Sequence, residues 1–245
     1  MYLVTGGSRG IGKSTVLDLV KLGKLVVFTY NHNLEKAKEV LNEAEQLKGT
    51  AIAIKVDFSE EDEIMALFNE LDKYKQPLIG VVNNVGIVKK QSSILDISLD
   101  RLKDIYNINV FANFLCIREA CRRMSTSLGG AGGSIVNVSS RASVLGSPNE
   151  YVDYASTKGA IDTMTIGTAK EFAEQGIRIN AVRPGLIKTD MHADSGEPER
   201  VKRLEQTIPL KRGGSVREVS EAICWLLSEK SAYVTGTFID VSGGR

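Results

Sequence analysis

The amino-acid sequence predicts an α/β protein with a doubly wound, seven-stranded parallel sheet and helices on both faces. Short apolar runs, many of them rich in β-branched residues, alternate with helical patterns along the 245 residues. The runs show little strict alternation of apolar and polar residues, as expected for strands buried on both faces. Such alternation of strand and helix builds right-handed βαβ units. The length suits one domain, 1–245, and is short for two.

The expected strands are apolar runs bounded by Gly, Asn or Asp. They lie at 3–4, 25–28, 51–54, 79–82, 134–138, 177–182 and 237–241. Helical patterns are found between them, near 10–22, 34–47, 60–74, 99–128, 153–175 and 215–228. Segment 186–212 is irregular, with a short helix expected near 198–206. An insertion near the carboxyl ends of the strands is the expected place for a substrate lid.

Composition argues against several classes of protein. The 31 Lys and Arg residues balance 30 Asp and Glu residues, so the net charge of +1 favours neither nucleic acid nor a membrane as a partner. No apolar run approaches the roughly 20 residues of a transmembrane helix, and no signal peptide is evident. Cys116, Cys121 and Cys224 form no CxxC pair, which fits free thiols in a reducing cytoplasm. His32 and His192 are far apart, so no metal site is predicted.

A glycine-rich turn follows the first expected strand and fits two phosphate-binding motifs. Its sequence is Thr5-Gly6-Gly7-Ser8-Arg9-Gly10-Ile11-Gly12-Lys13-Ser14. Residues 7–14 match the P-loop pattern, in which Lys13 and Ser14 would contact phosphate and magnesium. Gly6, Gly10 and Gly12 instead match TGxxxGxG, a dinucleotide-binding turn. Both motifs place a phosphate on backbone N–H groups at a helix N-terminus, so the turn alone does not decide between them.

The end of the second expected strand favours a dinucleotide with a 2′-phosphate. In a dinucleotide-binding fold, the residue at this point contacts the adenosine ribose. The sequence here is Phe28-Thr29-Tyr30-Asn31-His32-Asn33, which contains no acid to bond both ribose hydroxyls or to repel a 2′-phosphate. Arg9 in the turn is a candidate partner for that phosphate, with His32 assisting. The sequence therefore favours NADP(H) over NAD(H).

Tyr154 and Lys158 form a pair with a clear chemical use. If segment 153–175 is helical, residues four apart lie on one face, about one turn apart. An ammonium beside a phenol stabilises the phenolate and lowers the tyrosine pKa from its usual value of about 10. Such a tyrosine can donate a proton to a carbonyl being reduced or accept one from an alcohol. The spacing also fits an ordinary helix surface, so the pair gains weight only from the other motifs.

The motifs taken in order resemble those of the short-chain dehydrogenases/reductases, a family of Rossmann-fold, NAD(P)-dependent oxidoreductases. The resemblance spans essentially the whole chain. It rests on the turn 5–12, Asp57, Asn83-Asn84-Val85-Gly86, Asn107-Ile108-Asn109-Val110, Val138-Ser139-Ser140, Tyr154 with Lys158, Arg183-Pro184-Gly185 with Thr189, and Gly236 with Asp240-Val241-Ser242-Gly243-Gly244. So many motifs in the family's order are highly specific, and they set the P-loop alternative aside.

The resemblance implies a role for each motif. Tyr154 would act as general acid/base, Ser140 would hold the carbonyl oxygen, and Lys158 would bond the nicotinamide ribose and lower the Tyr154 pKa. Asn109, the fourth catalytic residue, would hold a water that links Lys158 to solvent. The cofactor-binding residues would be Gly6, Ser8, Arg9, Gly10, Ile11, Gly12, Tyr30, Asn31, Asp57, Asn83, Gly86, Tyr154, Lys158, Pro184, Gly185 and Thr189.

The resemblance also implies an activity and an assembly. The sequence is similar to those of bacterial 3-oxoacyl-carrier-protein reductases and glucose dehydrogenases. We therefore expect NADPH-dependent reduction of a carbonyl to an alcohol, or the reverse reaction. A homotetramer is expected, packed through the helices of Asn109 and Tyr154. A non-catalytic NADP-sensing protein on the same fold is the alternative, and a P-loop phosphotransferase is a remote one. The loop side chains Met191, His192, Ser195, Glu197, Arg200 and Lys202 suit sugars, polyols, keto esters and acyl thioesters equally.

Two features depart from the family pattern. Tyr154 lies 14 residues after Ser140, one more than is usual in the family. Ser139 and Ser140 should point to opposite sides of a strand, so only one can serve, and Ser140 is nearer the usual spacing. Tyr151 has Ala155 rather than a lysine four residues on. We therefore expect Tyr151 in the substrate-side wall or at the helix entry.

Overall fold

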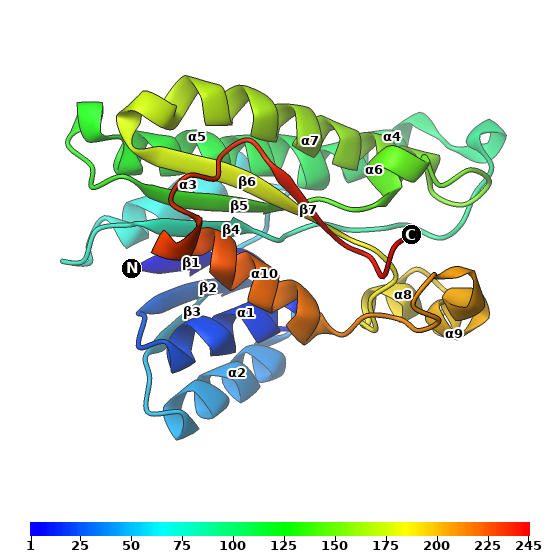
Figure 1. Ribbon diagram of the computed structural model, residues 1–245, viewed down its shortest axis with the longest axis horizontal. Coiled ribbons are helices and arrows are strands. Elements are labelled where there is room, and N and C mark those ends of the chain that lie inside the picture. The colour runs from blue at the N-terminus through cyan, green and yellow to red at the C-terminus, as the bar shows by residue number, and fades with distance from the viewer.

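A single seven-stranded parallel sheet forms the centre of the molecule (Figure 1). The computed structural model describes the backbone of residues 1–245 and all side chains except those of His192 and Asp194. The strand order is β3-β2-β1-β4-β5-β6-β7. The strands are β1 Tyr2–Val4, β2 Val26–Tyr30, β3 Ala51–Lys55, β4 Gly80–Asn83, β5 Gly133–Val138, β6 Ile177–Pro184 and β7 Phe238–Val241. The predicted doubly wound α/β fold is confirmed.

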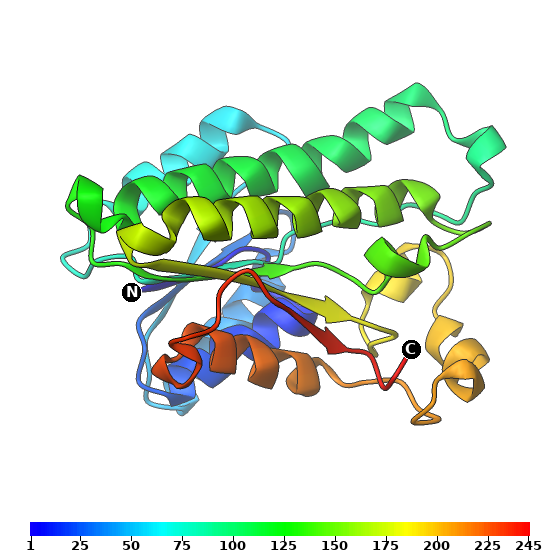
Figure 2. The ribbon, with the colours of Figure 1, turned by 45° about the horizontal axis from the view of Figure 1, so that its top comes forward.

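Helices cover both faces of this sheet (Figures 1 and 2). One face packs against α1 Gly10–Lys21, α2 Leu34–Gln46 and α10 Val216–Leu227. The other packs against α3 Glu61–Leu71, α5 Ala112–Met124 and α7 Val152–Phe172. The strands alternate between these two cores, since Leu3 and Val27 belong to one and Val4 and Phe28 to the other. Strands buried on both faces explain the nearly continuous apolar runs in the sequence.

The predicted helix 99–128 is interrupted where Asn109 lies. The structure has α4 Leu99–Tyr106, a π-helical turn Asn107–Phe111, then α5, followed by a 3₁₀ turn Thr126–Leu128. The amide of Asn113 donates to the backbone oxygen of Asn109 at 2.9 Å, so a side chain enters the helical hydrogen-bond ladder there. Turns of this type are frequent at functional sites, and this one presents Asn109 to the interior.

The expected lid contains two short helices instead of one. These are α8 Met191–Asp194 and α9 Arg200–Leu204, followed by a 3₁₀ turn Glu205–Thr207. A further short helix that the sequence did not predict, α6 Ala142–Leu145, lies between β5 and α7. Further 3₁₀ turns lie at Ile94–Asp96, Ala173–Gln175 and Glu229–Ser231. None of the described helices is long and apolar enough to cross a membrane.

The strand order predicts a ligand-binding position at the carboxyl ends of the central strands. Strand β1 pairs with β2 on one side and with β4 on the other, so the direction of winding reverses between β1 and β4. Ligands of open parallel sheets bind outside the carboxyl ends of the strands at this point. The glycine turn, the 83–86 segment and the loop after β5 all begin there.

Candidate active site

The glycine turn is held by side chains from the two neighbouring strands. The N–H of Gly6 donates to Thr29 Oγ1 at 2.9 Å. Asn84 Nδ2 donates to the backbone oxygens of Thr5 at 2.9 Å and Gly6 at 3.0 Å. In return, Thr5 Oγ1 accepts hydrogen bonds from the N–H groups of Asn84 and Val85. The segment after β4 therefore supports the turn, and Asn84 was not among the predicted site residues.

The glycines of the turn are required by its geometry. A Cβ on Gly12 would lie 2.3 Å from the Gly6 oxygen and 2.7 Å from Asn84 Nδ2, which leaves no room for a side chain. Gly6 and Gly10 have φ of +64° and +57°, values that glycine adopts at little cost. A Cβ on Gly10 would meet Thr189 Cγ2 at 3.9 Å, so Thr189 lies at the edge of the turn.

The start of α1 suits an anion. Arg9 is the N-cap residue and does not cap the helix with its side chain, and the first turn contains no acid. Backbone N–H groups of a first helical turn lack partners within the helix and carry partial positive charge. Together with the close glycine turn, they form a cradle of the kind that binds the pyrophosphate of a dinucleotide.

The residues that fitted a P-loop point away from this cradle. Lys13 Nζ donates to Glu43 Oε1 on α2 at 2.8 Å. The Ser14 hydroxyl lies 2.8 Å from the hydroxyl of Ser220 on α10. Both side chains link α1 to neighbouring helices, so they have an evident packing role in this fold.

The predicted adenosine-binding residues lie together at the ends of β2 and β3. Asp57 Oδ1 accepts hydrogen bonds from the N–H of Ser59 at 2.9 Å and its hydroxyl at 2.8 Å. These bonds, with smaller contributions from Asn31 and His32, lower the pKa of Asp57. Tyr30 ends β2 half-buried, and Arg9 is exposed at the start of α1. No acidic residue follows β2 directly.

Ser140, Tyr154 and Lys158 converge beyond the carboxyl end of β5. The Ser140 hydroxyl is close enough to the Tyr154 phenol to lower the phenol's pKa as a hydrogen-bond donor. Lys158 Nζ lies 5.6 Å from the centroid of the Tyr154 ring. It donates to the backbone oxygen of Val138 at 2.7 Å. A proton donor, a second hydroxyl and an ammonium group thus lie within one small site.

Burial reverses the expected shift of the Tyr154 pKa. Desolvation of the phenol raises its pKa to about 12, and the hydrogen bond from Ser140 offsets only part of this rise. The expectation that Lys158 lowers the Tyr154 pKa is therefore wrong for this arrangement, in which the ammonium bonds the Val138 oxygen. Burial also lowers the pKa of Lys158 to about 8, against the opposing charge of Asp162.

The two adjacent serines point in different directions. Ser139 is 2% exposed, and its hydroxyl donates to Asp162 Oδ1 at 2.6 Å. Asp162 also accepts from Arg183 Nε at 3.0 Å. Ser139 therefore belongs to a buried ionic network, whereas Ser140 lies beside the Tyr154 phenol.

Asn109 holds the loop after β4 with its whole side chain. Its Oδ1 accepts from the N–H of Ile87 at 2.7 Å, and its Nδ2 donates to the Ile87 oxygen at 2.9 Å. Nδ2 also donates to Thr157 Oγ1 at 3.1 Å, next to Lys158 in sequence. A Cβ on Gly86 would lie 3.3 Å from Asn109 Oδ1 and 3.5 Å from Lys158 Nζ. Glycine at 86 thus lets the loop approach both groups.

Asn83 lies apart from the other predicted residues. It is 2% exposed, and its Nδ2 donates to Asn137 Oδ1 at 2.9 Å, inside the sheet between β4 and β5.

Pro184 and Gly185 lie at the end of β6, and the N–H of Gly185 donates to the backbone oxygen of Val241 at 3.0 Å. A Cβ on Gly185 would lie 2.8 Å from Ser242 Cα, so the C-terminal motif packs directly on this segment.

Tyr151 is buried between the start of α7 and segment 186–212, the expected lid. It is the N-cap residue of α7 and is 5% exposed. Its hydroxyl lies 3.5 Å from Ser195 Oγ, and the guanidinium carbon of Arg200 lies 4.8 Å from its ring centroid. The side chains of Met191, Ser195, Glu197, Arg200 and Lys202 are described, whereas that of His192 lies outside the described residues.

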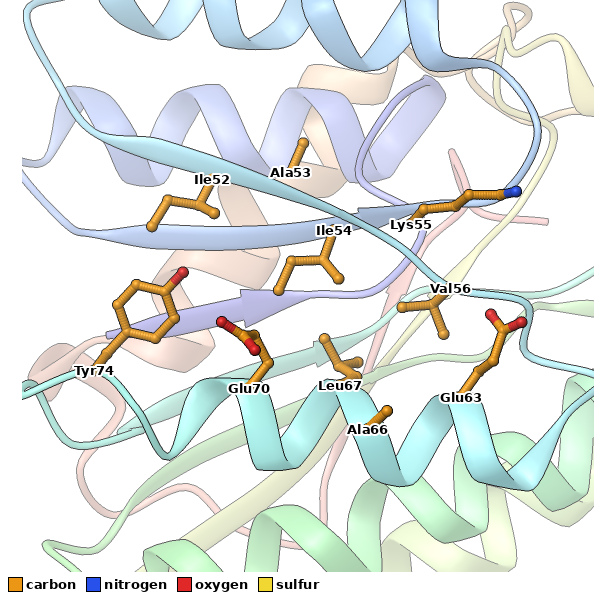
Figure 3. A pocket seen from close by; sticks show the side chains of 10 residues that line it. All are labelled: Ile52, Ala53, Ile54, Lys55, Val56, Glu63, Ala66, Leu67, Glu70 and Tyr74. Carbon is orange, nitrogen blue, oxygen red and sulfur yellow. The ribbon is translucent and has the colours of Figure 1, made fainter.

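A separate cavity lies at the lateral edge of the sheet, and its lining residue Glu63 accepts a hydrogen bond from the N–H of Asp57 at 2.6 Å. It has a volume of about 590 Å³ and opens between β3 and α3 (Figure 3). Its lining includes Ile52, Ile54, Lys55, Glu63 and Tyr74, and none of the predicted site residues. Among the residues whose side chains are described, no group of three His, Cys, Asp or Glu side chains could hold a metal ion.

Comparison with known proteins identifies the class to which this fold and site belong. A family model described as enoyl-(acyl carrier protein) reductase matches residues 6–245. A short-chain dehydrogenase/reductase from Serratia marcescens superposes with a TM-score of 0.91 at 28% identity, covering 99% of this chain and 96% of the other. The chain belongs to the short-chain dehydrogenase/reductase family of NAD(P)-dependent oxidoreductases.

Curated relatives cover the whole chain. An uncharacterized oxidoreductase of Escherichia coli, YgfF, is 51% identical over 99% of this chain and 98% of its own length. The 3-oxoacyl-[acyl-carrier-protein] reductase FabG of Staphylococcus aureus is 34% identical over 99% of this chain and 96% of its own. Glucose 1-dehydrogenase 2 of Bacillus subtilis is 33% identical over 99% and 93%. The predicted family and enzyme class are confirmed.

Proposed function

We propose that this protein is an NADP(H)-dependent oxidoreductase that reduces a carbonyl compound to an alcohol, or catalyses the reverse reaction. The observation that carries the proposal is that Ser140, the Tyr154 phenol and Lys158 come together beyond the carboxyl end of β5, with Lys158 Nζ 5.6 Å from the centroid of the phenol ring. These three residues and the glycine turn both lie at the carboxyl ends of the strands. A proton donor next to a dinucleotide-binding crevice is what carbonyl reduction requires.

The residues at the crevice fit a bound dinucleotide. The first-turn N–H groups of α1 would hold the pyrophosphate, and Asp57 with Asn31 would contact the adenosine. Thr189, next to Gly10, would bond the carboxamide, and Lys158 the ribose of the nicotinamide. Asn83 would contribute through its position in the strand rather than its side chain, which bonds Asn137. The bound nicotinamide would supply or accept the hydride.

The side chains of this site would position and protonate the substrate. Ser140 holds the carbonyl oxygen, and Tyr154 donates its proton to that oxygen as negative charge develops on it. The phenol is protonated at neutral pH, as a proton donor must be, and its raised pKa of about 12 makes it a weaker acid than a free tyrosine. Asn109 fixes the neighbouring loop through Ile87.

Preference for NADP(H) is supported by the end of β2. Tyr30, Asn31 and His32 follow one another there, and none carries a negative charge that would repel a 2′-phosphate. Arg9 is exposed at the start of α1 and can approach such a phosphate. The relatives named as 3-oxoacyl-carrier-protein reductase and glucose 1-dehydrogenase make keto thioesters and sugars the first substrates to test.

We also propose a homotetramer that works in a reducing cytoplasm. Cys116, Cys121 and Cys224 are free, and burial raises the pKa of each thiol to about 12. Thiols with such a high pKa react slowly, which is compatible with a structural role.

The test combines cofactor binding with turnover. We expect purified protein, titrated by nicotinamide fluorescence, to bind NADPH more tightly than NADH and to reduce at least one keto thioester or sugar carbonyl. Tyr154→Phe should lower kcat by about 10²–10⁴-fold, because the proton donor is lost, while the Kd for NADPH changes less than about twofold. Strong residual turnover by this variant would refute the assigned role. Tight NADPH binding without turnover of any carbonyl would instead favour a sensor.

A further inference from the structure

The lid over the candidate site is fastened by charged side chains. The lid, residues 191–207, comprises α8, α9 and the following 3₁₀ turn. It lies beyond the carboxyl ends of the strands, on the side where α7 begins (Figures 1 and 2). Two loops face it: residues 84–93 after β4, and residues 139–151 between β5 and α7. Side chains from all three segments meet around Arg200.

Arg200 binds the loop that leads into α7. Its Nη2 donates to Glu150 Oε2 at 2.5 Å, and its Nη1 donates to Glu197 Oε2 at 3.2 Å. Its guanidinium lies over the ring of Tyr151. The Arg200 side chain is only 8% exposed. Tyr151 lies three residues before Tyr154. Arg200 therefore connects the lid to the segment that positions the proton donor.

Glu197 extends the same cluster to the loop after β4. Gln91 Nε2 donates to Glu197 Oε2 at 2.6 Å. The backbone N–H of Ser92 donates to the backbone oxygen of Glu150 at 3.0 Å. Burial alone would raise the pKa of Glu150, but Arg200 and Arg203 outweigh it and lower the pKa. The cluster is therefore ionised at neutral pH and links three segments.

We propose that Arg200 is a positioning residue that latches the lid onto Glu150 and Tyr151, and that substrate entry requires this latch to open. The inference rests on the proposed function of the site. Closing the latch would shield the substrate carbonyl from water and hold Tyr151 as the outer wall of the pocket. Arg200 should therefore govern KM and lid opening, whereas Tyr154 governs the proton transfer.

Arg203 provides a matched control within the same helix. It carries the same charge and contacts the same two acids, donating to Glu197 Oε1 at 2.5 Å and Glu150 Oε1 at 3.2 Å. Its side chain is 49% exposed, however, and it does not lie on Tyr151. Exposed ion pairs are weakened by water and salt, so Arg203 should contribute little to the latch.

The experiment compares Arg200→Met with Arg203→Met in the full-length protein. Thermolysin cleaves before apolar residues, and the lid contains Val201 and Leu204. Arg200→Met should raise both the rate of lid cleavage and KM for the carbonyl substrate by about tenfold, because a buried ion pair is broken. Arg203→Met should change either value less than about threefold. The Kd for NADPH should stay within about twofold in both variants.

Two further variants separate the latch from a general loss of structure. Arg200→Lys keeps the charge but loses the planar fork and the stacking on Tyr151, so its cleavage rate should lie between wild type and Arg200→Met. The double variant Arg200→Glu with Glu150→Arg should restore slow cleavage in part. Circular dichroism melting of each variant checks that the fold remains.

The outcomes distinguish the latch from the proposed activity. Equal cleavage rates for Arg200→Met and Arg203→Met would overturn the latch. A fall in kcat with unchanged KM and unchanged cleavage would overturn it as well, because Arg200 would then act in the chemical step. If the wild-type protein turns over no carbonyl compound, the proposed function fails, and lid cleavage still decides whether Arg200 closes the lid.

Discussion

At Lys158, two physical effects act in opposite directions. Burial disfavours the ammonium and lowers its pKa to about 8, while the nearby Asp162 carboxylate favours the charged form. Asp162 is itself held by Ser139 and Arg183. The charge on the residue proposed to bond the nicotinamide ribose is thus sensitive to pH in a range where most lysines are fully protonated.

This shift leads to a prediction about cofactor affinity. A lowered pKa means that Lys158 is charged below about pH 8 and loses its charge as the pH rises through that value. The Kd for NADPH should therefore increase about tenfold between about pH 7 and pH 9, as a charge-assisted hydrogen bond weakens. Fluorescence titration at a series of pH values measures this change.

Lys158→Met is the control for this titration. The variant should bind NADPH weakly at every pH, and its Kd should not vary through the range around pH 8. If the same pH dependence persists in Lys158→Met, another group titrates and the interpretation is wrong.

At the level of elements, the turn between β1 and α1 depends on backbone contacts. A side chain at Gly12 would collide with the Gly6 oxygen and with Asn84 Nδ2, which supports the turn. Lys13, the next residue, reaches instead to Glu43 on α2. Adjacent positions on one helix therefore have different roles, one in the cradle and one in helix packing.

Substitution of these neighbours tests the assignment. Gly12→Ala should weaken NADPH binding by more than about tenfold, because the displaced turn no longer presents its N–H groups. Lys13→Ala should change the Kd less than about twofold, since it removes only a partly exposed ion pair. If Lys13→Ala lost NADPH binding while Gly12→Ala retained it, the interpretation of the turn as a dinucleotide-binding motif would be wrong, and the P-loop interpretation would gain support.

The π-helical turn shows what an element-level prediction misses. The apolar pattern of 99–128 indicates one long helix, and the structure follows that course through α4 and α5. The extra residue in the turn at Asn107–Phe111 depends on the Asn113 amide and on the contacts between Asn109 and Ile87. Ile87 lies 22 residues away in sequence, so helical periodicity alone carries no sign of the interruption.

At the scale of the whole molecule, four of the exposed large apolar side chains lie on α4, α5, α7 and the turn between α4 and α5. Leu99, Phe111 and Phe114 are 66%, 57% and 54% exposed on and between α4 and α5. Ile166 on α7 is 40% exposed. Helices α5 and α7 lie side by side on this face of the sheet (Figure 2). Exposed apolar side chains gathered on one face often mark a protein interface.

We therefore expect light scattering to give a mass four times the 26.7 kDa of one chain. Phe114→Glu should reduce that mass to a dimer or monomer, because an unpaired charge would be buried in the interface. Leu22→Glu is the matched control: Leu22 is 61% exposed at the end of α1, on the other face, and its substitution should leave the mass unchanged. A monomeric wild-type protein would contradict the tetramer.

The fold class and the family were predictable from the sequence, and the candidate site residues follow from the family's motifs. These features are local: strand–helix alternation, the spacing of glycines in the turn, and Tyr154 and Lys158 one helical turn apart. Three other features follow only from the tertiary structure: Ser140 lies beside the phenol, the Asn84 side chain supports the turn while that of Asn83 bonds Asn137, and Arg200 bonds Glu150. Arg200 and Glu150 lie 50 residues apart, and burial reverses the expected shift of the Tyr154 pKa. Such contacts and desolvation arise only when distant segments pack together, so no sequence spacing reveals them.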